Sequence, residues 1–439
     1  MTKHLLLDQS NVVASMGTGI ATYAKNLAIA AGQAGFGVDA LLSAHSGIDR
    51  KDPILTEVQL YDAPRGAALP WLTPLAVGVA GALRSGFGYR PVQLPAQHTV
   101  LKAAGEVSPF ERVFAATKLF DQARGYFHAF GRFARVRLPE APTLFHATHP
   151  LPIEVPGCPN LVTIHDLVPL RLPYMTLDNK RYFYRLIQTH LARADHIVTV
   201  SEYSRQDIIS LFGVAEHRIS NSYQAVSIPP KLLNRPAGML AEWVRNIFDL
   251  EWGEYFLFVG ALEPKKNVAR LIDAYAASGS RKPLVIAGGA GWQNDVENQR
   301  INDPRFSHYR IIENTISRFE RVRRITYLPF EQLIALLQGA RALLFPSVFE
   351  GFGLPVLEAM ALGTPVMTSN VTSLPEVAGD AAVMVDPHDT EAMARAIREL
   401  DQNGDLLKSL SEKGYVQAAK FTPEIYRNRV SDIYSSVVK

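Results

Sequence analysis

Short apolar runs alternate along this chain with segments in which apolar residues recur at helical spacing. Most of these runs lead into a turn that contains glycine, proline or polar residues, and a helical pattern follows. The alternation is typical of parallel sheets, because strands that point the same way must be joined by crossover helices. The predicted strands cover residues 5–7, 37–43, 161–164, 196–200, 255–259, 283–287, 324–328, 342–345 and 365–368. The pattern therefore predicts an α/β protein.

The alternation is interrupted over residues 227–250, where prolines are frequent. A chain of 439 residues is too long for one ordinary hydrophobic core, so we interpret this segment as a connection between two domains. The expected N-terminal domain covers residues 1–235, and the expected C-terminal domain covers residues 251–420. A last helix is predicted over residues 423–438, within the terminal segment 421–439.

The composition is that of a globular protein, with 47% hydrophobic and 20% charged residues. A formal net charge of +3 gives no reason to expect a nucleic-acid partner. Cys158 is the single cysteine, which excludes an intrachain disulfide and a cysteine-based metal site. The first apolar run is short for a signal peptide, and no stretch approaches the roughly 20 apolar residues of a membrane span. We therefore expect a cytoplasmic protein.

The most informative segment follows the predicted strand at residues 342–345. A turn that contains Glu350 leads into a helix starting near Leu354, and Glu358 comes one helical turn later. Glycines let the backbone approach a ligand, and free N–H groups at a helix start attract anions. The expected ligand contacts are Glu350, Gly351, Phe352, Gly353, Leu354 and Glu358. This arrangement suits a polyhydroxylated anion such as a sugar nucleotide, whereas a bare pair of glutamates would more often be solvated.

A second motif follows the predicted strand at residues 255–259. Gly260 makes a turn, and Lys265 and Lys266 stand immediately before the next helix. Ligands of open α/β sheets bind at the carboxyl ends of the strands, and lysine ammonium groups suit a diphosphate. Although most lysines are solvated surface charges, this position predicts contacts with phosphate.

The first predicted domain has a glycine turn, Gly17-Thr18-Gly19, between a strand and a helix. The turn could belong to a dinucleotide-binding fingerprint, but Thr22 stands where that pattern has its third glycine. Asp39, the ribose ligand that this alternative would need, falls inside a predicted strand rather than at its end. The alternative is therefore a poor match.

Three further polar positions follow predicted strands or begin helices. His165 and Asp166 stand at the carboxyl end of the strand at residues 161–164, where they could form a structural pair or part of a site. Ser201 precedes a predicted helix, where serine is a natural N-cap. Glu376, in a Leu-Pro-Glu-Val-Ala segment, is interpreted as structural.

The segment from Glu350 to Glu358 resembles the Glu-x7-Glu signature of family 4 of the retaining glycosyltransferases, which have the GT-B fold. The Leu-Glu-Pro-Lys-Lys-Asn and Thr-Ile-His-Asp-Leu segments resemble other motifs of the family, as does the loop at residues 17–19. The resemblance implies two Rossmann-like, doubly wound parallel-sheet domains that face a cleft. It also implies that the last helix crosses back to the N-terminal domain, which would supply the acceptor side.

The resemblance assigns roles to individual residues. Glu350 would contact hydroxyl groups of the donor sugar, and Glu358 would contact the ribose. Lys266, with Lys265 as the second candidate, would hold the donor phosphates. His165 would reach toward the donor sugar, so that His165, Glu350 and Lys266 form the expected catalytic set. The glycine loop at residues 17–19 would approach the donor phosphate or the acceptor, and His146 and His149 belong to a loop near the acceptor side.

The implied activity is transfer of a hexose from a nucleoside diphosphate sugar to a glycan or lipid-linked glycan in bacterial surface polysaccharide synthesis. Similarity to mannosyl- and rhamnosyltransferases favours GDP-mannose, and a UDP- or dTDP-sugar is the alternative. Ala261 stands where many family members have arginine, which leaves the second phosphate charge without an assigned partner. The family uses no metal and no further cofactor. From other classes, a non-catalytic nucleotide-sugar-binding partner and a dinucleotide-dependent oxidoreductase remain alternatives.

Residues 62–142 match the family least well and are interpreted as an insertion into the N-terminal domain. Residues 81–140 contain nine Lys or Arg against four Asp or Glu, with aromatic residues interleaved. Such a segment could lie on an anionic membrane, which would make the protein peripheral on the inner face of the plasma membrane. Alternatively, it is an ordinary helical insertion whose charges are solvated.

Overall fold

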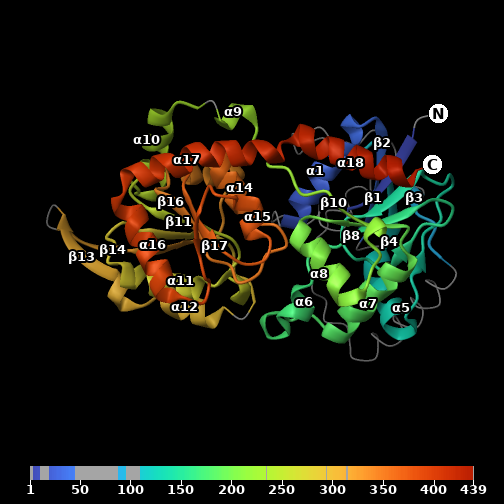
Figure 1. Ribbon diagram of the computed structural model, residues 1–439, viewed down its shortest axis with the longest axis horizontal. Coiled ribbons are helices and arrows are strands. Elements are labelled where there is room, and N and C mark those ends of the chain that lie inside the picture. The colour runs from blue at the N-terminus through green and yellow to red at the C-terminus, as the bar shows by residue number, and fades with distance from the viewer. Residues whose placement is uncertain are drawn as a thin grey trace.

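The chain forms two parallel sheets, each flanked by helices, which lie in two domains side by side (Figure 1). The computed structural model describes residues 3–9, 19–44, 88–94 and 109–438, except residues 234, 293 and 313–314. The strands of the first sheet come from the N-terminal half of the chain and those of the second from the C-terminal half, as the alternation of apolar runs predicts.

The first sheet has eight strands in the order β10-β9-β8-β6-β1-β2-β4-β3. Its neighbouring strands are parallel except β3, which runs antiparallel to β4. The strands are β1 Lys3–Asp8, β2 Phe36–Ala44, β3 Val92–Gln93, β4 Arg112–Thr117, β6 Leu144–Ala147, β8 Asn160–Thr163, β9 His196–Thr199 and β10 Ile219–Asn221. The consecutive leucines of β1 are all fully buried, which is the burial expected of a strand covered on both faces.

The helices of the N-terminal domain follow the strands in sequence. They are α1 Gly19–Gln33, α5 Leu119–Phe130, α6 Val168–Arg171, α7 Lys180–Arg193 and α8 Glu202–Phe212. Two short strands, β5 Ala134–Arg135 and β7 Ile153–Glu154, pair with each other outside the main sheet. The side chain of Ser201 accepts a hydrogen bond from the backbone N–H of Ser204, so the predicted N-cap of α8 is confirmed.

The second sheet has six parallel strands in the order β15-β12-β11-β16-β17-β18. They are β11 Phe256–Val259, β12 Leu284–Ala287, β15 Val322–Ile325, β16 Ala342–Phe345, β17 Val366–Ser369 and β18 Val383–Val385. The helices of this domain are α11 Val268–Ser278, α12 Asp295–Ile301, α13 Phe330–Gly339, α14 Leu354–Ala361, α15 Leu374–Ala378, α16 Thr390–Gln402 and α17 Gly404–Ala418. A hairpin of β13 Ser307–Ile312 and β14 Thr315–Glu320 extends away from the sheet (Figure 1).

The last helix, α18 Pro423–Val437, leaves the C-terminal domain and packs against α1 of the N-terminal domain (Figure 1). The ring of Tyr434, on this helix, packs edge-on against the ring of Phe36, with ring centroids 5.4 Å apart. The Tyr434 hydroxyl is hydrogen bonded to His146 Nδ1 at 2.8 Å. The terminal helix therefore belongs, by its packing, to the domain in which the chain begins.

The structure differs from the sequence prediction at two places. The segment at residues 227–250, which was interpreted as the connection between the domains and for which no helix was predicted, contains two helices, α9 Pro230–Leu233 and α10 Ala237–Phe248. Its prolines begin these helices, because the first helical N–H groups need no partner within the helix. The strand predicted at residues 324–328 lies earlier, at Val322–Ile325, where Val322 is buried in the sheet. Of the predicted insertion at residues 62–142, residues 62–87 and 95–108 lie outside the described residues.

Candidate active site

Loops at the carboxyl ends of strands from both sheets meet between the two domains. The C-terminal domain contributes the loop after β11, which contains Lys265 and Lys266, and the loop after β16, which contains Glu350. The N-terminal domain contributes His165 and Asp166, which follow β8. A Cβ atom built on Gly351 would lie only 2.7 Å from the His165 carbonyl oxygen, so the two domains are in close contact here. Only glycine fits at this position.

An ion pair joins the two loops of the C-terminal domain. Lys266 Nζ donates to Glu350 Oε1 at 2.6 Å, and it also lies 5.0 Å from the centre of the Phe345 ring. Burial alone would raise the pKa of Glu350, but Lys266 and then Lys265 outweigh it and hold that pKa below its ordinary value. Glu350 is therefore an ionised, buried carboxylate, and the predicted phosphate ligand Lys266 is its partner.

Lys265 is a second cation beside this pair, and its side chain is partly buried. Its ammonium nitrogen lies 4.0 Å from a carboxylate oxygen of Glu263. Burial lowers the pKa of Lys265, but the negative charges of Asp166, Glu350 and Glu263 outweigh it and raise that pKa above its ordinary value. Asp166 belongs to the N-terminal domain, so charges from both domains hold Lys265 in its protonated form.

The lysine loop has its shape fixed by Asn267, which the sequence analysis did not single out. Asn267 has a left-handed backbone with φ of 63°, between a turn of 3-10 helix at Pro264–Lys266 and the first residue of α11. Its buried side chain donates to the carbonyl oxygens of Pro346 at 3.0 Å and Pro387 at 2.7 Å. Since Pro346 begins the Glu350 loop, one side chain connects the two loops that carry the ion pair.

The Glu350 loop is held by the residues that precede α15. Ser373 Oγ donates to the carbonyl oxygens of Glu350 and Phe352, each at 2.9 Å. Thr372 Oγ1 accepts from the Glu350 N–H at 3.2 Å. Gly353 has φ of 106°, and a Cβ there would lie 2.7 Å from Leu374 Cδ2, so glycine is required as the residue before Leu354 at the start of α14. The loop therefore has one defined conformation.

Glu358 lies one turn into α14 and is partly buried. Burial raises the pKa of its carboxyl group from 4.5 to about 7. Within the described part of the chain, we find no hydrogen bond or ion pair to this carboxyl group. The two glutamates of the predicted signature therefore differ in their surroundings, because Glu350 is paired with a lysine and Glu358 is not.

Gly260 directly follows β11 with φ of 150°, and its carbonyl group packs against the glycine run that follows β12. A Cβ on Gly288 would overlap the Gly260 carbonyl, and a Cβ on Gly291 would overlap that of Leu262. This second glycine loop was not predicted, although a Gly-Gly-Ala-Gly run directly after a predicted strand is a recognisable signal.

His165 is held in one tautomer by its surroundings. Its Nε2 lies 2.9 Å from the carbonyl oxygen of Thr148, so this nitrogen carries the proton and donates. Burial lowers the pKa of His165 to about 4, which makes the ring neutral at neutral pH and leaves Nδ1 as an acceptor. The ring of Tyr23 packs edge-on against it, with ring centroids 4.8 Å apart.

The remaining candidates of the N-terminal domain have different surroundings. Gly17 and Thr18 lie outside the described residues, whereas Gly19 begins α1. Asp39 accepts from Arg112 at 3.0 and 2.7 Å and is buried in β2. Because this carboxylate is occupied by an internal ion pair, the dinucleotide-binding alternative loses its ribose ligand.

The histidines expected near the acceptor side are both buried or nearly so. His146 is hydrogen bonded to Tyr434 and Thr163, each at 2.8 Å, and burial lowers its pKa to about 3. His149 Nδ1 lies 3.5 Å from the buried carboxylate of Asp8. His146 is therefore a structural residue, and His149 is the one of the two that lies beside a carboxylate.

Two family models match the chain, one in each half. The model described as Glycosyl transferases group 1 matches residues 245–417, and the model described as Glycosyltransferase Family 4 matches residues 92–226. The first match contains Lys265, Lys266, Glu350 and Glu358, and the second contains His165. Both walls of the candidate site therefore lie in matched regions.

Three relatives in sequence carry related names. The chain is 36% identical over 269 residues to O-antigen chain mannosyltransferase B of Escherichia coli, which covers 60% of this chain and 67% of that protein. It is 31% identical over 265 residues to the serotype-specific mannosyltransferase WbdA of Escherichia coli, covering 59% of this chain but only 31% of WbdA. It is 28% identical over 249 residues to the O-antigen chain mannosyltransferase RfbU of Salmonella typhimurium, covering 56% and 62%.

Two solved structures share the fold along nearly the whole chain. Sucrose-phosphate synthase from Thermosynechococcus elongatus matches with a TM-score of 0.65 and 18% identity, over 99% of this chain and 98% of that chain. Anabaena Alr3699/HepE in complex with UDP and glucose matches with a TM-score of 0.63 and 15% identity, over 99% and 100%. At these identities the likeness concerns the fold, which is the GT-B arrangement of two Rossmann-like domains.

Proposed function

Since this chain belongs to the group 1, family 4 glycosyltransferases, we propose that it transfers a mannosyl residue from GDP-mannose to a glycan or lipid-linked glycan acceptor in bacterial surface polysaccharide synthesis. The names of the three relatives support the sugar and the pathway class. The observation that carries the activity is the partly buried Lys266–Glu350 pair, with 2.6 Å between Nζ and Oε1, at the contact between the two domains. A UDP- or dTDP-sugar is the alternative donor.

In the proposed reaction, the lysines stabilise the leaving group. The bond between the anomeric carbon and the phosphate oxygen breaks, and a bond to the acceptor oxygen forms on the same face of the sugar. Lys266 and Lys265 would oppose the charge that develops on the diphosphate, which is how preorganised electrostatics lowers a barrier. The acceptor proton would pass to the departing phosphate oxygen. Configuration is then retained, and the lysines supply the positive charge that a metal supplies in other enzymes.

The carboxylates and His165 would position the donor. When a diphosphate shares the ammonium of Lys266, Glu350 gains free lone pairs that can accept from sugar hydroxyls. Glu358, for which we find no hydrogen bond or ion pair among the residues that the structure describes, would accept from the ribose. His165 Nδ1 is an acceptor because its Nε2 proton is committed to Thr148, so it would receive a hydrogen bond from a donor-sugar hydroxyl. Each of these groups binds or orients the donor without forming a covalent intermediate.

A transfer assay tests this proposal. The purified protein is incubated with GDP-mannose, UDP-glucose or dTDP-rhamnose and a lipid-linked glycan acceptor, with and without EDTA. We expect transfer from GDP-mannose, unchanged by EDTA, with an α-linked product by NMR. Transfer from another donor would show that the proposed donor sugar is wrong. Inversion of the anomeric configuration would contradict the proposed mechanism, and loss of activity in EDTA would contradict metal independence. Nucleotide binding without transfer to any acceptor would favour the non-catalytic alternative.

We also propose that the basic surface of α5 and α7 contacts anionic membranes. Arg124, Arg181 and Arg185 are exposed on these helices, and Phe130 is 59% exposed and Tyr184 42% exposed beside them. Exposed aromatic rings among arginines suit the headgroup region of a membrane. Among the helices in the described ranges, none is both long and apolar enough to cross a bilayer.

Vesicle sedimentation tests the membrane contact. The protein should sediment with phosphatidylglycerol vesicles at low salt and less with phosphatidylcholine vesicles. The variant Arg181→Glu with Arg185→Glu should reduce sedimentation, whereas Arg395→Glu, an exposed arginine on α16, should not. Equal sedimentation of both variants and the wild type would remove this surface from the proposal.

A further inference from the structure

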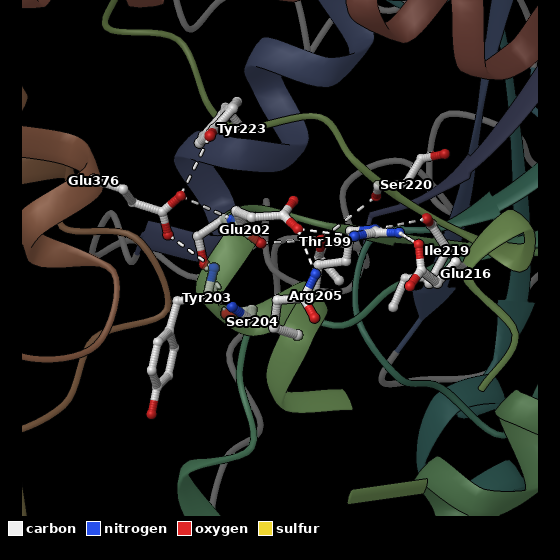
Figure 2. Close-up of polar contacts among 12 residues, drawn as sticks. Thr199, Glu202, Tyr203, Ser204, Arg205, Glu216, Ile219, Ser220, Tyr223 and Glu376 are labelled. Carbon is white, nitrogen blue, oxygen red and sulfur yellow. Dashed lines mark hydrogen bonds and ion pairs between the residues drawn. The ribbon is translucent and has the colours of Figure 1, made fainter. Parts of the chain in front are cut away.

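A carboxylate of the C-terminal domain binds the start of a helix of the N-terminal domain. Figure 2 shows Glu376, on α15, directed at the first turn of α8. Its two carboxylate oxygens accept from the backbone N–H groups of Glu202 at 3.0 Å and Tyr203 at 2.9 Å. The hydroxyl of Tyr223 donates to it at 3.3 Å. A carboxylate at the positive end of a helix, with charge-assisted bonds to N–H groups, is a strong interaction.

The same turn of α8 also contacts the two walls of the site. Ser204 Oγ donates to the carbonyl oxygen of His165 at 2.8 Å and lies 3.4 Å from the carbonyl oxygen of Gly351. His165 is the predicted donor contact in the N-terminal domain, and Gly351 belongs to the Glu350 loop of the C-terminal domain. One helix end is therefore bonded to His165 and, through Glu376, to the other domain.

In the C-terminal domain, Glu376 is close in sequence to a residue that holds the Glu350 loop. Ser373, which donates to the carbonyl oxygens of Glu350 and Phe352, immediately precedes the short helix that carries Glu376. Ser373 thus contacts the Glu350 loop, and Glu376, three residues later in the chain, contacts α8. A shift of α15 relative to α8 would move Glu350 relative to His165.

A second carboxylate, that of Glu202, lies near this contact but is bonded to a different residue. Glu202 is the first residue of α8, and its side chain accepts from Arg205 at 2.8 Å, away from Glu376 (Figure 2). Tyr223 has a left-handed backbone with φ of 57°, and Arg429 of α18 lies 4.7 Å from the centre of its ring. Tyr223 also packs against Phe421, at the point where the chain crosses back to the N-terminal domain. Tyr223, one of the partners of Glu376, is therefore held by residues of α18 and of the segment that precedes it.

We propose that Glu376 is a positioning residue for transfer: its bonds to α8 hold the Glu350 loop against His165 in the arrangement in which the donor reacts. This inference rests on the proposed function, and it revises the interpretation of Glu376 as merely structural. Glu376 contacts neither lysine nor Glu358, so its loss leaves the nucleotide contacts in place. Misplacement by about 1 Å in an active site can lower a rate by roughly 10²-fold.

The test compares Glu376→Ala and Glu376→Gln with Asp389→Ala. Asp389 also caps a helix with its carboxylate, accepting from the Ala392 N–H at 2.8 Å, but this helix belongs to its own domain. We expect Glu376→Ala to lower kcat by about 10- to 100-fold, with the Kd for GDP changed by less than about threefold. Glu376→Gln should recover part of the rate, because its amide oxygen still accepts from an N–H group. Asp389→Ala should lower the Tm but leave kcat within about twofold of wild type.

Small-angle X-ray scattering provides a second measurement that does not depend on turnover. With GDP present, Glu376→Ala should have a larger radius of gyration than the wild type and Asp389→Ala. The proposal is overturned if Glu376→Ala keeps its kcat, if GDP affinity falls in parallel with kcat, or if Asp389→Ala loses as much activity. If the wild type transfers no sugar, the proposed function fails. Identical scattering of Glu376→Ala and wild type would then overturn the positioning role as well.

Discussion

At the scale of single residues, the account depends most on Lys266. Replacing it with alanine removes the charge proposed to stabilise the leaving diphosphate and leaves Glu350 without its 2.6 Å partner. We expect Lys266→Ala to lower kcat/KM by about 10²-fold or more, as the loss of one oxyanion contact does. Steady-state kinetics measures this, with Lys408→Ala, an exposed lysine on α17, as the control. Activity close to that of the wild type would remove Lys266 from the site.

A second prediction at this scale concerns Glu358, whose pKa is raised by burial to about 7. A carboxyl group with a raised pKa in the folded state contributes stability below its unfolded pKa and loses that contribution as pH rises through the folded pKa. Glu358→Gln cannot ionise, so its Tm relative to the wild type should be higher at pH 8 than at pH 5. The difference should be about 5–10 °C, which corresponds to roughly 2.5 kcal/mol for domains of this size.

Thermal unfolding of both proteins at the two pH values measures this difference. Glu412→Gln, at an exposed position on α17, is the matched control and should show no such change. If Glu358→Gln and the wild type keep a constant difference in Tm between pH 5 and pH 8, the pKa of Glu358 is not raised by burial.

The sequence predicts which of these residues lie in the site but not how they are paired. Lys266 and Glu350 each follow a buried strand, and the carboxyl ends of parallel strands meet at one edge of a sheet. Their ion pair could not be predicted, because the residues are 84 positions apart and meet only through the conformations of two loops. Glu376 was interpreted as structural for the same reason, since its partners in α8 lie more than 170 residues away.

At the scale of the elements, the lysine loop depends on Asn267. Asn267→Ala would remove two hydrogen bonds to buried carbonyl groups and place alanine at φ of 63°. The lost bonds should cost about 1–3 kcal/mol, and left-handed backbone adds about 1 kcal/mol for alanine. Asn267→Gly keeps the backbone conformation and loses only the bonds. Urea unfolding should therefore give the order wild type, Asn267→Gly, Asn267→Ala from most to least stable, and equal stability of all three would contradict the argument.

The regular elements follow from the sequence more fully than the loops do. The strand at residues 342–345 has the predicted bounds, because its four residues form an uninterrupted apolar run that is buried throughout. The helix α10 was not predicted because the prolines of residues 227–250 were interpreted as an interruption of the pattern, whereas Pro236 stands at the N-cap position of the helix. A proline has opposite effects at the start and in the middle of a helix, and the sequence pattern alone does not separate the two cases.

At the scale of the whole molecule, α18 ties the C-terminal end of the chain to the N-terminal domain. The hydrogen bond between Tyr434 and His146 is fully buried, so Tyr434→Phe leaves a polar atom of His146 without a partner. We expect a loss of about 1–3 kcal/mol in the free energy of unfolding, measured in urea. Tyr327→Phe, at a side chain 64% exposed, should be neutral within about 0.5 kcal/mol. An equal effect of the two substitutions would show that the terminal helix does not depend on this contact.

The GT-B architecture was predicted through family resemblance, whereas the alternation of apolar runs predicts only two α/β halves. The crossing of α18 to α1 depends on contacts between residues about 400 positions apart, such as that of Tyr434 with Phe36. No local pattern specifies such a contact. The contact of Gly351 with His165 across the two domains is of the same kind, and it is what makes the separate motifs a single site.

Nucleotide binding tests whether Lys266 holds the donor diphosphate. Wild type and Lys266→Ala are titrated by calorimetry with GDP, UDP, dTDP, ADP and NAD, with Lys408→Ala as the control. We expect one nucleoside diphosphate, GDP, to bind selectively to the wild type and to Lys408→Ala, and we expect Lys266→Ala to lose this binding. Binding of NAD alone, or GDP binding that is unchanged in Lys266→Ala, would contradict a donor site built on the Lys266–Glu350 pair.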